Sequence, residues 1–107
     1  MIEVTVKKRD GSYQDFVSRG HADYAQEGQD IVCAAVSALV ITTVNSLEAF
    51  TAEKFEVSEQ DGFVSIHFSC FPNTEPGKLL MDSLLLGLTD IEHSYSNRYL
   101  TVRVKEV

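Results

Sequence analysis

The chain has 107 residues, of which 44% are hydrophobic and 23% charged, and its 9 basic and 16 acidic residues give a net charge of −7. This length suits one domain with a hydrophobic core of its own, so we expect a single domain over residues 1–107. The acidic balance argues against capture of nucleic acid or of an anionic membrane, because both need a basic surface, and it leaves basic partners open.

The chain begins with a pattern that is typical of a β-hairpin. Residues 2–6 alternate apolar and polar side chains, as a half-buried strand does. Asp10 and Gly11 follow, and this pair favours a tight turn because both residues tolerate a positive φ. We therefore expect a second strand over residues 13–19.

A polar loop and a long helix come next. Residues 20–29 have no steady period and include two glycines, which predicts a loop longer than most connections. Asp30 is a preferred N-cap, and apolar residues recur at helical spacing from Ile31 to about Phe50. The apolar arc of this helix is wide enough to be buried on more than one side. The apolar-rich stretch 31–44 is interrupted by hydroxyl side chains and is expected to fall short of a membrane span.

The second half of the chain repeats the order of hairpin and helix. Residues 53–70 predict two strands around an Asp-Gly turn at 61–62, with Cys70 on the core side of the second strand. The cluster at 73–76 is typical of a helix start, and residues 100–104 alternate as a final strand. The apolar stripe of the second helix comprises Leu79, Leu80, Leu84, Leu88 and Ile91.

The predicted order of elements is therefore β-β-α-β-β-α-β. Hairpins separated by helices indicate a mixed or mostly antiparallel sheet with both helices packed on it. We expect an α+β fold, a single-domain two-layer sandwich in which the leucine stripe of the second helix faces the core or a dimer interface.

Cysteine content indicates the compartment. Cys33 and Cys70 are too few for the multi-bridge framework of a small secreted protein, so an unbridged pair in a reducing compartment is expected. The first residues form a strand pattern rather than the apolar run of a signal peptide. The sequence therefore predicts a cytoplasmic protein.

A candidate catalytic pair flanks the loop. His21 follows the second strand, and Cys33 falls in the first turn of the expected helix. A cysteine hydrolase needs a thiolate nucleophile and an imidazole that takes and returns the proton. First-turn N–H groups stabilise a thiolate; a charged Asp30 opposes one, although we expect its carboxylate to be occupied by some of those N–H groups. Ser37 lies one turn after Cys33 on the same side of the helix, where its hydroxyl can bond within the site.

The strings Gly-His-Ala at 20–22 and Gly-Gln-Asp-Ile-Val-Cys-Ala-Ala-Val-Ser at 28–37 resemble the ribosomal-processing cysteine protease family (Prp). In length and element order the resemblance extends over the whole chain. Members of that family are small bacterial dimeric proteins that remove a short N-terminal extension from a large-subunit ribosomal protein. The resemblance implies a cysteine endopeptidase and a homodimer whose substrate is a ribosomal protein precursor.

The same resemblance implies the roles of individual residues. It implies that Cys33 is the nucleophile and that His21 is the general base and acid. The supporting positions are Asp30 and Ser37, and the loop hinges are Gly20 and Gly28. Family substrates are cut after an aromatic residue, which implies an apolar pocket. First-turn N–H groups, including that of Cys33, are candidate oxyanion donors, and no third residue that orients His21 can be assigned.

Other functions have weaker support in the sequence. The Cys and His residues lack the paired spacing of a metal site, and no glycine-rich phosphate loop follows a strand, so we expect neither a metal nor another cofactor. His67 and His93 are expected on the surface. The alternative is a non-catalytic ribosome-associated module that docks through the 20–30 loop, but such a module has no evident need for both His21 and Cys33.

Overall fold

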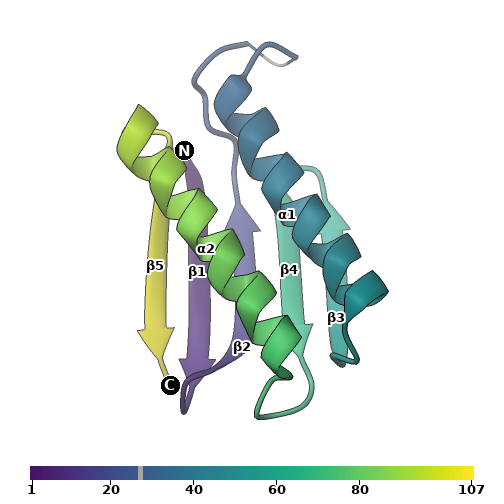
Figure 1. Cartoon of the computed structure of the whole chain (residues 1–107). Coiled ribbons are helices and arrows are strands. Elements are labelled where there is room, and N and C mark those ends of the chain that lie inside the picture. Colours follow the sequence, from purple (N-terminus) through teal and green to yellow (C-terminus); the bar gives the residue numbers. More distant parts are fainter. Residues whose placement is uncertain (27) are drawn as a thin grey trace.

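The computed structural model describes residues 1–26 and 28–107, so Glu27 in the predicted loop lies outside the described residues. The predicted order β-β-α-β-β-α-β is confirmed (Figure 1). The strands are β1 (Ile2–Arg9), β2 (Ser12–Arg19), β3 (Phe55–Gln60), β4 (Phe63–Phe68) and β5 (Leu100–Glu106), and the helices are α1 (Ile31–Phe50) and α2 (Glu75–Tyr95).

The strands form one mixed sheet in the order β3-β4-β2-β1-β5. β5 runs parallel to β1, whereas the other neighbouring strands are antiparallel. β4 and β5 lie on opposite sides of the β2–β1 pair, and α2 carries the chain between them across one face of the sheet (Figure 1). α1 covers the same face, so the expected α+β fold of two layers is confirmed.

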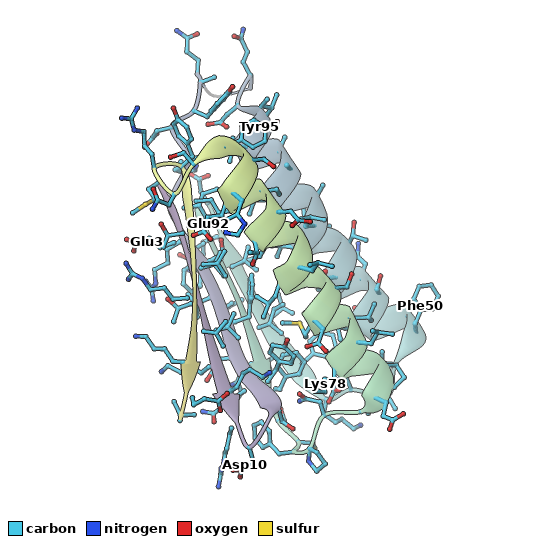
Figure 2. All side chains as sticks on the ribbon, turned by 60° about the vertical axis from the view of Figure 1, so that its left-hand side comes forward. Glu3, Asp10, Phe50, Lys78, Glu92 and Tyr95 are labelled. Carbon is cyan, nitrogen blue, oxygen red and sulfur yellow. The ribbon has the colours of Figure 1, made fainter. Side chains whose placement is uncertain are left out.

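Strand alternation determines which side chains enter the core. The sheet residues buried beneath the helices include Ile2, Val4, Val6, Phe16, Ile66, Phe68 and Leu100. Figure 2 shows Glu3 on the other side of the sheet, away from the helices. His67 also lies on that open face, where its Nδ1 is 2.6 Å from Oδ1 of Asp15 on the neighbouring strand, so its predicted surface position is confirmed.

The helix α1 packs on two sides, as its wide apolar arc predicts. Its stripe of buried residues comprises Val32, Val36, Val40, Thr43 and Leu47. On a second side Leu39 lies over Gly87 of α2, where an added Cβ would be 2.9 Å from a Leu39 methyl carbon. By length and composition alone this helix is long and apolar enough to cross a membrane, so the sequence-based expectation that its apolar stretch is too short is wrong.

One sequence-based placement is also wrong, and one predicted stripe is divided. The leucine stripe of α2 is predicted to face the core or a dimer interface; Leu84 and Leu88 are buried in the core, whereas Leu79 is 68% exposed. Cys70 was expected on the core side of a strand, but β4 ends at Phe68 and Cys70 is exposed in the following loop. Periodicity placed both residues on the apolar side, but the helix turns Leu79 away from the sheet and the strand ends before Cys70.

One end of the sheet gathers three segments that are distant in the sequence. β2 and β4 pair with Arg19 opposite Phe63, which brings the chain after β2 beside the Asp61-Gly62 turn. The N–H of Gly20 donates to the carbonyl oxygen of Gly62 at 2.8 Å. The first turn of α1 lies at the same end (Figure 1), so the loop, the helix start and the β3–β4 turn meet there.

Candidate active site

The carboxylate of Asp30 organises the start of α1. As N-cap it accepts hydrogen bonds on Oδ1 from the N–H groups of Val32 and Cys33, both at 3.0 Å. Its Oδ2 accepts from Tyr24 at 2.9 Å and from Ala25 at 3.4 Å, which ties the loop to the helix. Burial alone would raise the pKa of this carboxyl, but the four backbone N–H groups outweigh burial and hold the pKa below its usual range.

These bonds confirm that the Asp30 carboxylate is occupied, and they also correct one expectation. The N–H of Cys33 donates to Asp30 Oδ1. It therefore does not point freely toward a substrate, and its expected role as an oxyanion donor is not supported by this geometry. The carboxylate fixes the turn that carries the sulfur.

The sulfur of Cys33 has a hydrogen-bond donor of its own. The N–H of Ala22 donates to Sγ at 3.1 Å. The Ala22 side chain is buried, which fixes this N–H against the start of α1. Sequence reasoning missed the bond, because a backbone N–H carries no residue-type signal.

His21 leaves the end of β2 through a glycine with no room for a side chain. Gly20 has φ +95°, and a Cβ there would collide with the carbonyl oxygen of Met1. The side chain of His21 is 58% exposed, and its Nε2 is 3.9 Å from Oδ2 of Asp61. Its ring also lies against Gly62, because an added Cβ at that position would be 2.9 Å from His21 Nε2.

Two hollows meet at Cys33, and polar and apolar side chains line both of them. The first has a volume of about 650 Å³, and its lining includes the carboxylates of Glu59 and Asp61 as well as the apolar residues Ile2, Val36, Val40, Ile41, Phe63 and Val64. The second, of about 460 Å³, has three carboxylates in its lining, those of Asp23, Asp30 and Asp61. Both volumes fall in the range of ligand-binding sites, about 300–1,000 Å³.

Every residue that the sequence singled out lines at least one hollow. His21, Cys33 and Ser37 line both of them. Gly20 lines the first, and Gly28 and Asp30 line the second. The structure thus brings all six to one place on the surface.

Asp61 also lines both hollows and was missed as a site residue. In the sequence Asp61 belongs to an Asp-Gly pair, and such a pair is most simply explained by a tight hairpin turn. Only the pairing of β2 with β4 brings this turn to His21. Within residues 1–26 and 28–107, no three His, Cys, Asp or Glu side chains converge as metal ligands would.

The loop before Cys33 is also held by aromatic contacts. The Tyr24 ring meets those of Tyr95 and Tyr99 edge to face, with centroids 5.5 and 5.1 Å apart. Figure 2 shows Tyr95 at the far end of α2 from Lys78, so the loop rests on the end of the second helix. Such aromatic pairs contribute about 0.5–1.5 kcal/mol each beyond the area they bury.

Comparison with known proteins shows the family of the chain. Residues 1–100 match the model of the family described as Cysteine protease Prp. The chain is 31% identical over 96 residues to the ribosomal processing cysteine protease Prp of Staphylococcus aureus, covering 89% of this chain and 90% of that protein. It is 30% identical over 103 residues to the Prp of Bacillus subtilis, covering 91% and 92%.

Solved structures extend the likeness to three dimensions. The S. aureus Prp with a covalently linked product peptide matches with a TM-score of 0.92 and 31% identity, over 98% of this chain and all of that chain. The same protease with a substrate peptide matches with a TM-score of 0.85 and 30% identity, over the same shares of the two chains. The chain therefore belongs to the cysteine protease Prp family.

Proposed function

We propose that this cysteine protease removes the N-terminal extension of a large-subunit ribosomal protein, and that residues 1–107 form one cysteine protease domain. The observation that carries the proposal is that Cys33, in the first turn of α1, lines two adjoining hollows together with His21. Family membership supports the peptidase activity, and the relatives named for ribosomal processing support the substrate class.

In the proposed mechanism Cys33 is the nucleophile and His21 the general base and acid. The thiolate attacks the scissile carbonyl carbon, and His21 protonates the nitrogen as the C–N bond breaks, which leaves a thioester on Cys33. Water, deprotonated by His21, then hydrolyses the thioester and releases the acid. The N–H of Ala22 supports this role, because a donor at 3.1 Å stabilises negative charge on Sγ.

Supporting roles go to Asp30, Ser37 and two glycines. Asp30 holds the helix start and the loop together through four backbone N–H groups. Ser37 lies beside Cys33 in both hollows, within reach of a bound peptide. Gly20 and Gly28, both at positive φ, are proposed as the hinges on which the loop closes over substrate.

The two hollows give the bound peptide a direction. An aromatic residue before the scissile bond fits the first hollow, where Val36, Val40 and Val64 offer apolar contacts. The leaving segment then occupies the second hollow, whose lining includes Ala25, Gly28 and Ala34. The net charge of −7 supports a basic protein substrate rather than nucleic acid or an anionic membrane.

We further propose a cytoplasmic homodimer. Reduced thiols support the cytoplasm, because the cysteines Cys33 and Cys70 are free and the mechanism needs the first as a thiolate. Exposed apolar side chains on the helical layer support a dimer. Leu79 and Leu86, two turns apart on α2, are 68% and 66% exposed, and Phe50 at the end of α1 is 77% exposed.

The test uses a peptide that spans the cleavage region of the ribosomal protein precursor. Wild type is expected to cleave it after an aromatic residue, while Cys33→Ala and His21→Ala yield no product. Cys70→Ala and His67→Ala, at exposed positions outside the hollows, are the matched controls and retain activity. Tight binding without product by wild type would instead establish the non-catalytic docking module.

A further inference from the structure

The turn that follows β3 lies against the imidazole ring of His21. In the described structure Gly62 and Asp61 approach the same ring nitrogen, Nε2. The hydrogen bond from Gly20 N–H to the Gly62 carbonyl oxygen holds this turn to the backbone that immediately precedes His21. One hairpin therefore holds the backbone next to His21 and also contacts the His21 ring.

The contact with Gly62 is steric and leaves no room for a side chain. A Cβ at that position would lie 2.9 Å from Nε2, 3.4 Å from Cε1 and 3.5 Å from Cδ2 of His21. Real Cβ atoms do not approach a ring nitrogen this closely, so an alanine would push the imidazole away from the turn. The absence of a side chain at residue 62 therefore allows the ring to lie against the turn.

The contact with Asp61 is electrostatic. The carboxylate oxygen Oδ2 is 3.9 Å from Nε2, and the Asp61 side chain is 96% exposed, so the attraction is screened by water. A carboxylate beside Nε2 favours the tautomer that carries its proton there, which leaves Nδ1 as the unprotonated ring nitrogen. Because an exposed ion pair is weak, the steric contact is expected to matter more.

We propose that the Asp61-Gly62 turn positions His21 for proton exchange with Cys33, with Gly62 fixing the place of the ring and Asp61 favouring its Nε2–H tautomer. Both are positioning residues that act through His21. The inference rests on the proposed function, since it deepens the part that His21 plays there.

The chain holds its own matched control. Asp10 and Gly11 form a second Asp-Gly hairpin turn, at the opposite end of the sheet from the site (Figure 2). Gly11 has φ +80° and Gly62 has φ +68°, so an alanine is strained by the backbone at both positions. At Gly11, however, an added Cβ meets nothing within 4 Å. A difference between the two alanine variants therefore does not come from backbone strain, and the ring shifts described below separate the ring contact from an effect on the first hollow, which Gly62 also lines.

The experiment compares Gly62→Ala with Gly11→Ala, and Asp61→Asn with Asp10→Asn, in steady-state cleavage of the precursor peptide. We expect Gly62→Ala to lower kcat about 10- to 100-fold, because misplacement of a catalytic group by about 1 Å costs up to about 100-fold. Asp61→Asn is expected to lower kcat about 2- to 5-fold, as loss of an exposed charge pair would. In both variants KM stays unchanged, and the variants of the control turn keep wild-type kcat.

A second readout does not depend on turnover. The ¹⁵N chemical shifts of the His21 ring are expected to show the Nε2–H tautomer in wild type, a mixture of tautomers in Asp61→Asn, and a changed ring environment in Gly62→Ala. Asp10→Asn and Gly11→Ala leave these shifts unchanged. If Gly62→Ala does not fold, Asp61→Asn carries the test.

Three results would overturn the inference: unchanged kcat and ring shifts in both turn variants, equal losses in the control turn, or an effect confined to KM, which would make Asp61 a substrate contact. Failure of the proposed function looks different. In that case wild type does not cleave the peptide, and the ring shifts alone then decide whether the turn positions His21.

Discussion

The N–H of Ala22 donates to Sγ of Cys33 at 3.1 Å, so the residue after His21 is bonded to the sulfur that His21 is proposed to serve. This bond joins the loop end of β2 to the first turn of α1, eleven positions further along the chain. A short hydrogen bond across this separation requires that the loop fold back on itself. It therefore connects the conformation of the loop to the surroundings of the sulfur.

The two cysteines are predicted to react in the order opposite to their exposure. Cys70 is exposed and Cys33 only partly so, and accessibility alone would make Cys70 the faster. If Cys33 is the nucleophile, however, the Ala22 N–H that donates to its sulfur serves the reactive thiol, so iodoacetamide at neutral pH is expected to label Cys33 first. Mass spectrometry of the labelled peptides measures both rates. In urea the two rates should converge, and faster labelling of Cys70 in the folded protein would contradict activation.

The cap of α1 is predicted to stabilise both the helix and the loop. Asp30→Ala removes the acceptor of four backbone N–H groups and is expected to lower the free energy of unfolding by about 1–2 kcal/mol. Asp30→Asn keeps one acceptor oxygen and should lose less. Urea unfolding measures both, with Asp90→Ala on the exposed side of α2 as a control. An Asp30→Ala variant as stable as wild type would show that these bonds contribute nothing.

The two glycines that flank the loop are predicted to differ in their tolerance of alanine. At Gly28 an added Cβ lies in open space, and only the φ of +86° is unfavourable, so Gly28→Ala should cost about 1 kcal/mol. At Gly20 the Cβ also collides with the backbone of Met1, so Gly20→Ala should cost about 3 kcal/mol. Thermal unfolding of the two variants checks the order, and equal losses would mean that the Met1 backbone gives way without cost.

The Tyr13–Asp82 pair predicts a two-sided dependence of stability on pH. Burial, followed by the hydrogen bond to Asp82, raises the pKa of Tyr13 well above 10.0, its ordinary value. Burial opposes ionisation of Asp82, but the bonds from Tyr13 and Lys78 outweigh it and hold the Asp82 pKa below 3.8, its ordinary value. The Asp82 contribution is therefore complete above pH 3.8 and lost as the pH falls through the lowered pKa. The Tyr13 contribution is complete below pH 10.0 and lost as the pH rises beyond it.

Urea unfolding across the pH range separates the two groups of this pair. Tyr13→Phe is expected to remove the alkaline loss of stability, and Asp82→Asn to reduce the loss below pH 3.8. Asp10→Asn, at the exposed β1–β2 turn, serves as the carboxylate control. Identical pH profiles in wild type and both variants would show that ionisation of this pair does not affect the free energy of unfolding.

Much of the fold follows from local sequence. The alternation of Ile2, Val4 and Val6 and the helical spacing after Asp30 depend on neighbours a few residues away, so β1 and α1 were predicted close to their observed bounds. Such local patterns do not predict exposure where the packing of distant segments determines it. Leu79 and Cys70 carry an apolar residue type in a plausible period, but only the packing of the finished layers shows that both are exposed.

The candidate site divides in the same way. The residue strings around His21 and Cys33 were sufficient by themselves to indicate the family, and the resemblance to that family implies the six site positions. The tertiary structure alone decided which groups surround that pair. The Ala22 N–H at the sulfur, the Asp61-Gly62 turn at the imidazole and the two hollows all arise from pairing between distant segments, β2 with β4 and the loop with α1. A contact of this kind depends on strand register and on the path of the backbone, so it cannot be predicted from the residue types alone.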